Sequence, residues 1–180
     1  SSPKDDNVYT DVFVNTSSDG GLTWLPAPIQ LNNAEARAMN PAIACSGDTV
    51  YVVWEDERDG DLAYHNIYVD VSTNGGRQFL DRDIALDNDP EGDWMSLAPQ
   101  IVARGDSAYV TWFDQRNGAY DIFVQASTDR GSSWLEEPTR VATDDEGSAW
   151  SSQPRLDADG NGQVVVVWED RRDGVSDIYA

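Results

Sequence analysis

Two short motifs recur along this chain at nearly constant spacing, and this repetition constrains the fold more than any other feature. The first motif has the form Ser-x-Asp-x-Gly-x-x-Trp, and its successive serines are 55 residues apart. Its three copies comprise Ser17, Asp19, Gly21 and Trp24; Ser72, Asn74, Gly76 and Phe79; and Ser127, Asp129, Gly131 and Trp134. Such a repeat is typical of folds in which each unit buries its apolar face only against a neighbouring unit.

The second motif, Trp-x-Asp-x-Arg-x-Gly, also occurs once in each repeat. Its copies are Trp54, Asp56, Arg58 and Gly60; Trp112, Asp114, Arg116 and Gly118; and Trp168, Asp170, Arg172 and Gly174. Residues two apart on a strand share one face, so we expect each aspartate and arginine to form an ion pair that holds the following loop. The alternative is that Arg58, Arg116 or Arg172 binds a ligand carboxylate.

The middle repeat predicts a four-stranded antiparallel sheet. Residues 99–103 and 108–112 form two apolar runs joined by the turn cluster Arg104-Gly105-Asp106, which indicates a hairpin. Residues 121–126 supply a third strand and 134–141 a fourth. No segment shows a sustained 3.6-residue apolar period. We therefore expect an all-β protein with one such sheet per repeat, in a single unit spanning residues 1–180.

The first motif has a mechanical explanation. Short Ser and Asp side chains accept hydrogen bonds from backbone amides of their own turn, and glycine supplies the positive φ that closes it. The aromatic residue three positions after the glycine can then fold back as an apolar plug. A serine without a nearby histidine base is not a nucleophile, so we expect these motif residues to be structural.

Composition excludes several classes of partner. The chain has 12 basic and 33 acidic residues, a net charge of −21, which disfavours contact with nucleic acids and anionic membranes. No apolar stretch approaches the roughly 20 residues of a membrane helix. Cys45 is the only cysteine, so no intrachain disulfide is possible, and its apolar surroundings predict a core position. His65, the only histidine, is expected on a loop surface.

Two tryptophans are not explained by the motifs. Trp94 and Trp150 lie in acidic loops shortly before Pro99 and Pro154. Aromatic faces beside carboxylates are suited to sugar rings, or to calcium together with a sugar. The two indoles are therefore candidate ligand contacts, and the alternative is that they pack between sheets. Candidate calcium ligands in the first loop are Asp87, Asp89 and Asp93.

These motifs resemble the Asp-box (BNR) repeats of the sialidase superfamily over nearly the whole chain. The resemblance implies a β-propeller in which each repeat forms one blade around a central axis, with six blades in sialidases. Three blades cannot close a ring, so we expect half of a six-bladed propeller that a second copy of the chain completes. The alternative is a piece of a longer propeller.

The resemblance also bears on activity. Catalytic sialidases carry Arg-Ile before the proline of a blade's first strand, whereas the residues two before Pro41, Pro99 and Pro154 are Met39, Leu97 and Ser152. Neither Met nor Leu replaces a guanidinium that clamps a carboxylate. We therefore expect a secreted or periplasmic, non-catalytic propeller that binds glycan or another surface partner at its axial face, with calcium as the only candidate ion.

Two alternatives to a binding protein stay open. The first is an exo-sialidase or related glycoside hydrolase, whose acid/base aspartate would correspond to Asp59 or Asp61 in the loop after the second motif. The second is an architectural part of a larger extracellular protein. Fold-level analogy alone does not decide among these functions.

Overall fold

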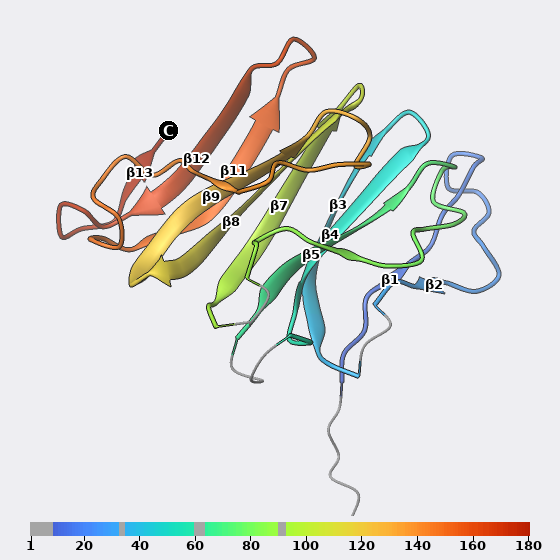
Figure 1. Ribbon diagram of the computed structural model, residues 1–180. Coiled ribbons are helices and arrows are strands. Elements are labelled where there is room, and N and C mark those ends of the chain that lie inside the picture. Colours follow the sequence, from blue (N-terminus) through green and yellow to red (C-terminus); the bar gives the residue numbers. More distant parts are fainter. Residues whose placement is uncertain (1–8, 33–34, 60–63, 90–92) are drawn as a thin grey trace, which may run out of the picture.

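The computed structural model describes residues 9–32, 35–59, 64–89 and 93–180. These residues form antiparallel sheets that lie side by side in chain order, and no helix occurs among them (Figure 1). The all-β prediction and the four-stranded antiparallel sheets are thereby confirmed. No helix in the described part of the chain is long and apolar enough to cross a membrane.

We name the sheets by their order along the chain. The half-blade consists of β1 (Phe13–Val14) and β2 (Ile29–Gln30). Blade A contains β3 (Ala38–Ser46), β4 (Thr49–Asp56), β5 (Asn66–Ser72) and β6 (Ile84–Ala85). Blade B contains β7 (Ser96–Arg104), β8 (Ser107–Asn117), β9 (Ala119–Ser127) and β10 (Thr139–Arg140). Blade C contains β11 (Ser151–Ala158), β12 (Val164–Asp170) and β13 (Asp177–Tyr179).

The strands hold equivalent places in every blade. The first strands, β3, β7 and β11, lie next to one another in space. The half-blade supplies only third and fourth strands, because β1 pairs with β2 as β5 pairs with β6. We call the end where β4, β8 and β12 finish the loop face, and the opposite end, which carries the turns of the first motif, the turn face.

The core consists of apolar layers between neighbouring blades. Alternate residues of a strand face opposite sides, so β4 presents Tyr51 and Val53 to blade B and Val52 and Trp54 to the half-blade. The layer between blades A and B is the largest of these layers. Its buried members are Tyr51, Val53, Ile67, Val69, Val71, Leu86, Ala103, Ala108, Val110, Trp112 and Phe123. Each blade thus depends on its neighbour for burial.

The first motif forms the expected turn. In the third copy, Ser127 Oγ accepts a hydrogen bond from the Gly131 amide at 2.9 Å and donates to Asp129 Oδ1 at 2.9 Å. Asp129 also accepts from the amide and hydroxyl of Ser133. The first two copies repeat the serine contact to the glycine amide, with Asn74 in place of aspartate in the second.

The aromatic residues of the first motif are not equally buried. Trp134 packs against the layer between blades A and B, and Phe79 packs against the layer between the half-blade and blade A. Trp24, in contrast, is 59% exposed. The buried plug predicted from the sequence is therefore not formed at Trp24 in the described part of the chain.

This difference predicts unequal effects of the same substitution. Trp134→Ala is expected to lower the free energy of unfolding by about 2 kcal/mol, because it removes a large side chain from an inter-blade layer. Trp24→Ala is expected to cost less than about 0.5 kcal/mol, as for other exposed positions. Urea denaturation of both variants would measure this, and equal losses would contradict the packing described here.

The second motif also forms one arrangement three times. The Trp ring stacks on an aromatic ring of the third strand with a centroid distance of 6.3 Å, in the pairs Trp54–Tyr68, Trp112–Phe123 and Trp168–Tyr179. The guanidinium of the motif's arginine lies over that same third-strand ring, at 4.1, 4.5 and 4.0 Å respectively. Aspartate and arginine are paired in every copy, as predicted.

Each first strand contains a bulge at the residue before its proline. Asn40, Ala98 and Gln153 have φ values of 51°, 52° and 53°, and the strand register shifts at each of them. Left-handed backbone is unusual for residues other than glycine. Its recurrence at three equivalent positions indicates a built-in feature that redirects the start of every first strand.

The prediction that Cys45 is a core residue is wrong. Its side chain is exposed on β3, although partial burial raises the pKa of its thiol above the ordinary value. Its equivalent in blade B is Ala103, which is buried because Tyr51 and Val53 of blade A lie in the same layer. Among the described residues, no strand lies over Cys45 as β4 lies over Ala103.

Candidate functional site

The loop face carries the two unexplained tryptophans. Trp94 lies two residues before β7 and Trp150 directly before β11, and their exposed fractions are 41% and 51%. The Trp150 ring lies 5.0 Å from that of Tyr120, which in turn meets the edge of Phe113 at 5.0 Å. Half of the Trp150 indole is thus packed between blades B and C, and half faces solvent.

The loops position these indoles through backbone contacts. The Trp94 amide donates to Asp89 Oδ2 at 2.9 Å. In the second loop, the Gly147 amide donates to Asp121 Oδ2 at 3.2 Å, and a Cβ atom at Gly147 would lie 1.8 Å from the Asn117 carbonyl oxygen. Only glycine allows the Trp150 loop to approach blade B this closely.

A cluster of charged side chains lies beside Trp94 on the same face. His65 contacts Glu55 Oε2 through Nδ1 at 3.1 Å and Glu57 Oε1 through Nε2 at 3.3 Å. Arg37 also contacts Glu57 Oε1 at 3.3 Å. Both glutamates are buried, and the Glu57 Oε2 atom has no hydrogen-bond partner. An unpaired buried carboxylate oxygen is costly, so this cluster can accept a further hydrogen-bond donor.

Glu55 also joins two blades. Its Oε1 atom accepts hydrogen bonds from Asn40 Nδ2 at 2.9 Å and from the amide of Ala98, in blade B, at 2.7 Å. Asn40 and Ala98 are the bulge residues of β3 and β7, so the bulge places the Ala98 amide toward this carboxylate. The cluster therefore occupies the junction between blades A and B, where the two first strands begin.

The prediction that His65 lies on a loop surface is wrong. Its side chain is only 13% exposed, because it lies between the two glutamates. The same places in blade B are taken by Phe113 and Tyr120, so the equivalent junction between blades B and C is aromatic. Comparing equivalent positions of the repeats could have revealed part of this cluster, since His65 departs from its equivalents Tyr120 and Ser176, whereas Glu55 recurs as Glu169 in blade C.

Arg58, Arg116 and Arg172 make internal contacts. Besides the paired aspartate and the aromatic ring, Arg58 contacts Asp83, Arg116 donates to the Asp87 carbonyl, and Arg172 donates to Thr143. These contacts agree with the scaffold interpretation of the motif. Ligand binding by one of the three arginines stays a prediction.

The candidate acids are only partly described. Asp59 is exposed, and its Oδ2 atom accepts hydrogen bonds from the Tyr68 hydroxyl and from Asn66 Nδ2. Burial and the hydrogen bond to Asp59 raise the pKa of Tyr68. Asp61 lies outside the described residues. The two carboxylates therefore cannot be compared as an acid and a base.

The candidate calcium ligands do not converge on one point. Asp87 Oδ2 accepts from the Ile67 amide at 2.8 Å, Asp89 holds Trp94, and Asp93 is exposed. Burial raises the pKa of Asp87 to about 7, and a protonated carboxyl is a poor calcium ligand. The described residues contain no group of three suitable side chains that could hold a metal ion. Calcium binding by this loop stays a prediction.

Comparison with known proteins identifies the fold. No family model and no curated protein sequence matches the chain. Solved structures do match, among them Zg3597, a family 117 glycoside hydrolase of the marine bacterium Zobellia galactanivorans, at 13% identity and a TM-score of 0.52. It is matched over 94% of this chain and 55% of its own. The chain has the fold of part of a β-propeller.

Two further structures support the same conclusion. The α-L-arabinanase of Penicillium chrysogenum is 13% identical, with a TM-score of 0.51 over 90% of this chain and 52% of its own. The α-L-arabinofuranosidase of Lactobacillus brevis is 15% identical, with a TM-score of 0.50 over 87% and 52%. These hydrolases are five-bladed propellers, and this chain spans about half their length. Membership of the sialidase superfamily and a six-bladed ring stay predictions.

Proposed function

We propose that this chain is a carbohydrate-binding propeller unit and that sugars bind at the loop face. The observation that supports this most is that the partly exposed Trp94 and the charged cluster lie on segments of the chain that pair with each other. His65 and Met95 form a parallel β-bridge, and the Ser96 amide donates to the His65 carbonyl at 2.8 Å. Trp94 therefore directly precedes Met95, the residue that pairs with His65.

This combination suits a sugar ring. An aromatic face covers the apolar C–H side of a pyranose or furanose, and carboxylates accept hydrogen bonds from its hydroxyl groups. Within this cluster, Glu57 Oε2 is a buried acceptor without a partner among the described residues. The similar structures are named as hydrolases of carbohydrates, which supports this substrate class for the propeller without assigning a reaction to this chain.

Binding is favoured over catalysis because the carboxylates at the loop face already have structural contacts. Glu55 joins blades A and B, and the positions that hold the sialidase arginine are Met39, Leu97 and Ser152. A related glycoside hydrolase is the second candidate, since the carboxylates of Glu55 and Glu57 both contact His65 at the loop face. We also propose a secreted or periplasmic location, which follows the sialidase resemblance, and cell fractionation tests it.

A glycan array followed by calorimetric titration of the strongest hit tests binding. Trp94→Ala is expected to weaken that interaction about fivefold, because packing on an aromatic ring contributes about 1 kcal/mol. Trp24→Ala removes an exposed indole at the turn face and should leave the affinity unchanged. Absence of any hit, or equal loss in both variants, would overturn the proposal and favour an architectural role.

The same preparation separates binding from hydrolysis. Fluorogenic sialosides and α-L-arabinofuranosides are expected to stay intact on incubation with the protein. Release of fluorophore that Glu57→Gln or Asp59→Asn abolishes would replace the binding proposal with the hydrolase. Thermal unfolding of both variants shows whether lost activity reflects lost folding.

A further inference from the structure

One position of the repeat carries a different kind of side chain in blade A. It lies two residues before the serine of each first motif, and its occupants are Asn15, Asp70 and Gln125. In every copy a side-chain oxygen at this position accepts a hydrogen bond from the next backbone amide, at 2.8, 2.7 and 2.9 Å respectively. Of these three copies, the one in blade A has a carboxyl group where the other two have a carboxamide.

The carboxamides make a second contact that needs a hydrogen-bond donor. Asn15 Nδ2 donates to the carbonyl oxygen of Leu25 at 3.3 Å, and Gln125 Nε2 donates to that of Leu135 at 3.0 Å. Each of these leucines directly follows the aromatic residue of the first motif. The side chain before the turn is thus joined to the backbone after the turn.

Asp70 and Leu80 occupy the same two places in blade A. The Leu80 amide donates to Asp70 Oδ1 at 3.0 Å, just as the Leu25 amide donates to Asn15 Oδ1 at 3.0 Å. The second oxygen of Asp70, Oδ2, therefore corresponds to the Nδ2 atom that donates to the leucine carbonyl. An ionised carboxylate has no hydrogen to donate, whereas a protonated carboxyl group has one.

The surroundings of Asp70 favour its protonated form. The residue is 2% exposed and lies on the same side of β5 as Tyr68, which packs in the apolar layer against the half-blade. The nearby charge that acts on it is the carboxylate of Asp83, which Arg58 contacts at 2.6 Å. Burial raises the pKa of Asp70 to about 6, the charge of Asp83 adds to this, and two backbone amides oppose it.

We propose that Asp70 is a pH-dependent latch for residues 80–83, the segment between the turn of the first motif and β6. In the closed state the protonated Asp70 Oδ2 donates to the Leu80 carbonyl oxygen, as the carboxamides do in the other copies. When Asp70 releases this proton to solvent, its carboxylate repels that carbonyl and the charge of Asp83, and the segment loosens from β5. This device goes beyond the proposed glycan binding and does not depend on it.

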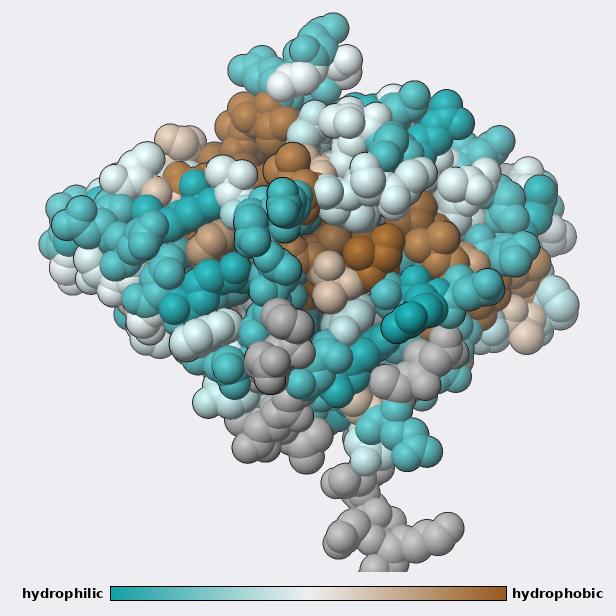
Figure 2. All heavy atoms as spheres, viewed as in Figure 1, coloured by the Kyte–Doolittle hydropathy of each residue, from teal (hydrophilic) through white to brown (hydrophobic). Residues whose placement is uncertain are grey.

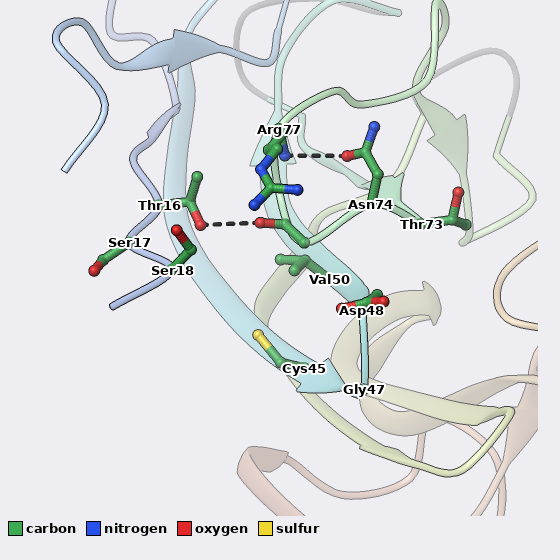
Figure 3. Close-up of a pocket in the computed structure, with 11 residues that line it drawn as sticks. Thr16, Ser17, Ser18, Cys45, Gly47, Asp48, Val50, Thr73, Asn74 and Arg77 are labelled. Atoms are coloured by element: carbon green, nitrogen blue, oxygen red, sulfur yellow. Dashed lines mark hydrogen bonds between the residues drawn. The ribbon is translucent and has the colours of Figure 1, made fainter. Parts of the chain in front are cut away.

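Contacts on either side limit the loosening to residues 80–83. In the preceding turn, Thr16 Oγ1 donates to the Gly75 carbonyl oxygen at 2.9 Å (Figure 3). After the segment, Ile84 and Leu86 pack in the layer between blades A and B. Figure 2 shows hydrophobic residues gathered across the middle of the visible face, where Figure 1 draws the chain that follows β5. The turn and β6 therefore stay in place while the residues between them move.

The latch has a pH dependence of defined sign. The pKa of Asp70 rises from 3.8 to about 6 in the folded protein, so the closed latch keeps a proton that an open one releases. Its contribution is fully present below about pH 4 and is lost as the pH rises to about 6. Hydrogen bonds lower the pKa of Asp129 in the third copy of the first motif, so that turn is not loosened in the same window.

Hydrogen exchange, measured by mass spectrometry on peptides that cover residues 80–83, tests the latch. Asp70→Asn supplies the carboxamide that the first copy carries, so the contact no longer needs a proton. Base catalysis accelerates exchange equally in both proteins, so the wild-type rate divided by the variant rate isolates the latch. This ratio is expected to rise at least about fivefold between about pH 4 and pH 7. For residues 135–138, the equivalent segment of blade B, it should stay constant.

A second variant transfers the latch to blade B. Gln125 is 2% exposed, so Gln125→Glu buries a carboxyl group at the equivalent position. Exchange of residues 135–138 should then acquire the pH dependence, while residues 80–83 keep that of the wild type. The NMR signal of the Asp70 carboxyl carbon should titrate with a pKa of about 6. A ratio that is constant with pH, no new pH dependence in Gln125→Glu, or titration of Asp70 at its ordinary pKa of 3.8 would overturn the proposal.

Discussion

Gly131→Ala is expected to lower the free energy of unfolding by about 3 kcal/mol. The backbone at Gly131 has a φ of 79°, which costs any other residue roughly 1 kcal/mol. The added Cβ would also lie 2.9 Å from Val71 and 3.1 Å from Tyr51, both buried between blades A and B. Overpacking of a closed layer adds about 1 to 3 kcal/mol.

Gly105 offers a matched control for the backbone contribution. It has a φ of 59° in the β7–β8 turn, and a Cβ atom there meets nothing within 4 Å. Gly105→Ala should therefore cost only about 1 kcal/mol. Guanidinium denaturation of the two variants separates steric overlap from backbone strain, and equal losses would show that blades A and B are not closely packed at the turn face.

Asp87→Asn is expected to remove a pH dependence of stability of about 2 to 3 kcal/mol between pH 5 and pH 8. Burial raises the pKa of Asp87 to about 7, and the nearby charge of Asp114 adds to it, while the Ile67 amide and Arg116 oppose it. The folded state therefore binds a proton that the unfolded state has released. Wild-type stability falls as the pH rises through this window.

Asparagine is expected to fit at position 87, because the half-blade already has asparagine at the equivalent position. Asn32 holds the equivalent place in the half-blade, where its Oδ1 accepts from the Val12 amide at 2.8 Å. Asp70, whose pKa burial raises to about 6, adds a residual slope of the same sign in both proteins. Urea denaturation across this pH range is the measurement, and parallel profiles for wild type and variant would contradict a buried, protonated Asp87.

The loss of folding stability at low pH has a different cause. Hydrogen bonds from Thr23 and Ser17 lower the pKa of Asp19 to about 2, and Arg172 lowers that of Asp170. These carboxylates are ionised in both the folded and the unfolded state between pH 5 and pH 8, so they add no slope there. Their contribution is present above pH 4, about the unfolded pKa, and is lost as the pH falls further.

The sequence predicted those parts of the fold that depend on local chemistry. The serine turn, the Asp–Arg pair and the strand order follow from residues close together in the chain, and each occurs in several copies. Cys45 and His65 were misplaced because their surroundings come from other segments. Whether Cys45 is covered depends on a neighbouring blade, and His65 is buried by Glu55 and Glu57 across the β4–β5 connection.

Only part of the candidate site could be predicted from the sequence, for the same reason. Trp94 and Trp150 were conspicuous because no motif explained them. The charged cluster becomes apparent only when positions are aligned between blades, because Glu57 and His65 then differ from Gln115 and Tyr120 in blade B. The repeating residues indicate the scaffold, and departures from the repeat are the better indication of function.

The opposite placement of the two motifs has a practical consequence. The Ser-x-Asp-x-Gly turns close the sheets at the turn face, while Trp94, Trp150 and the charged cluster lie at the loop face. Exposed loop-face residues such as Trp94 and Trp150 can therefore be exchanged without touching the turns that close the sheets. A library of variants at such exposed positions, with Glu55 and Gly147 kept, would search for new specificities on one stable scaffold.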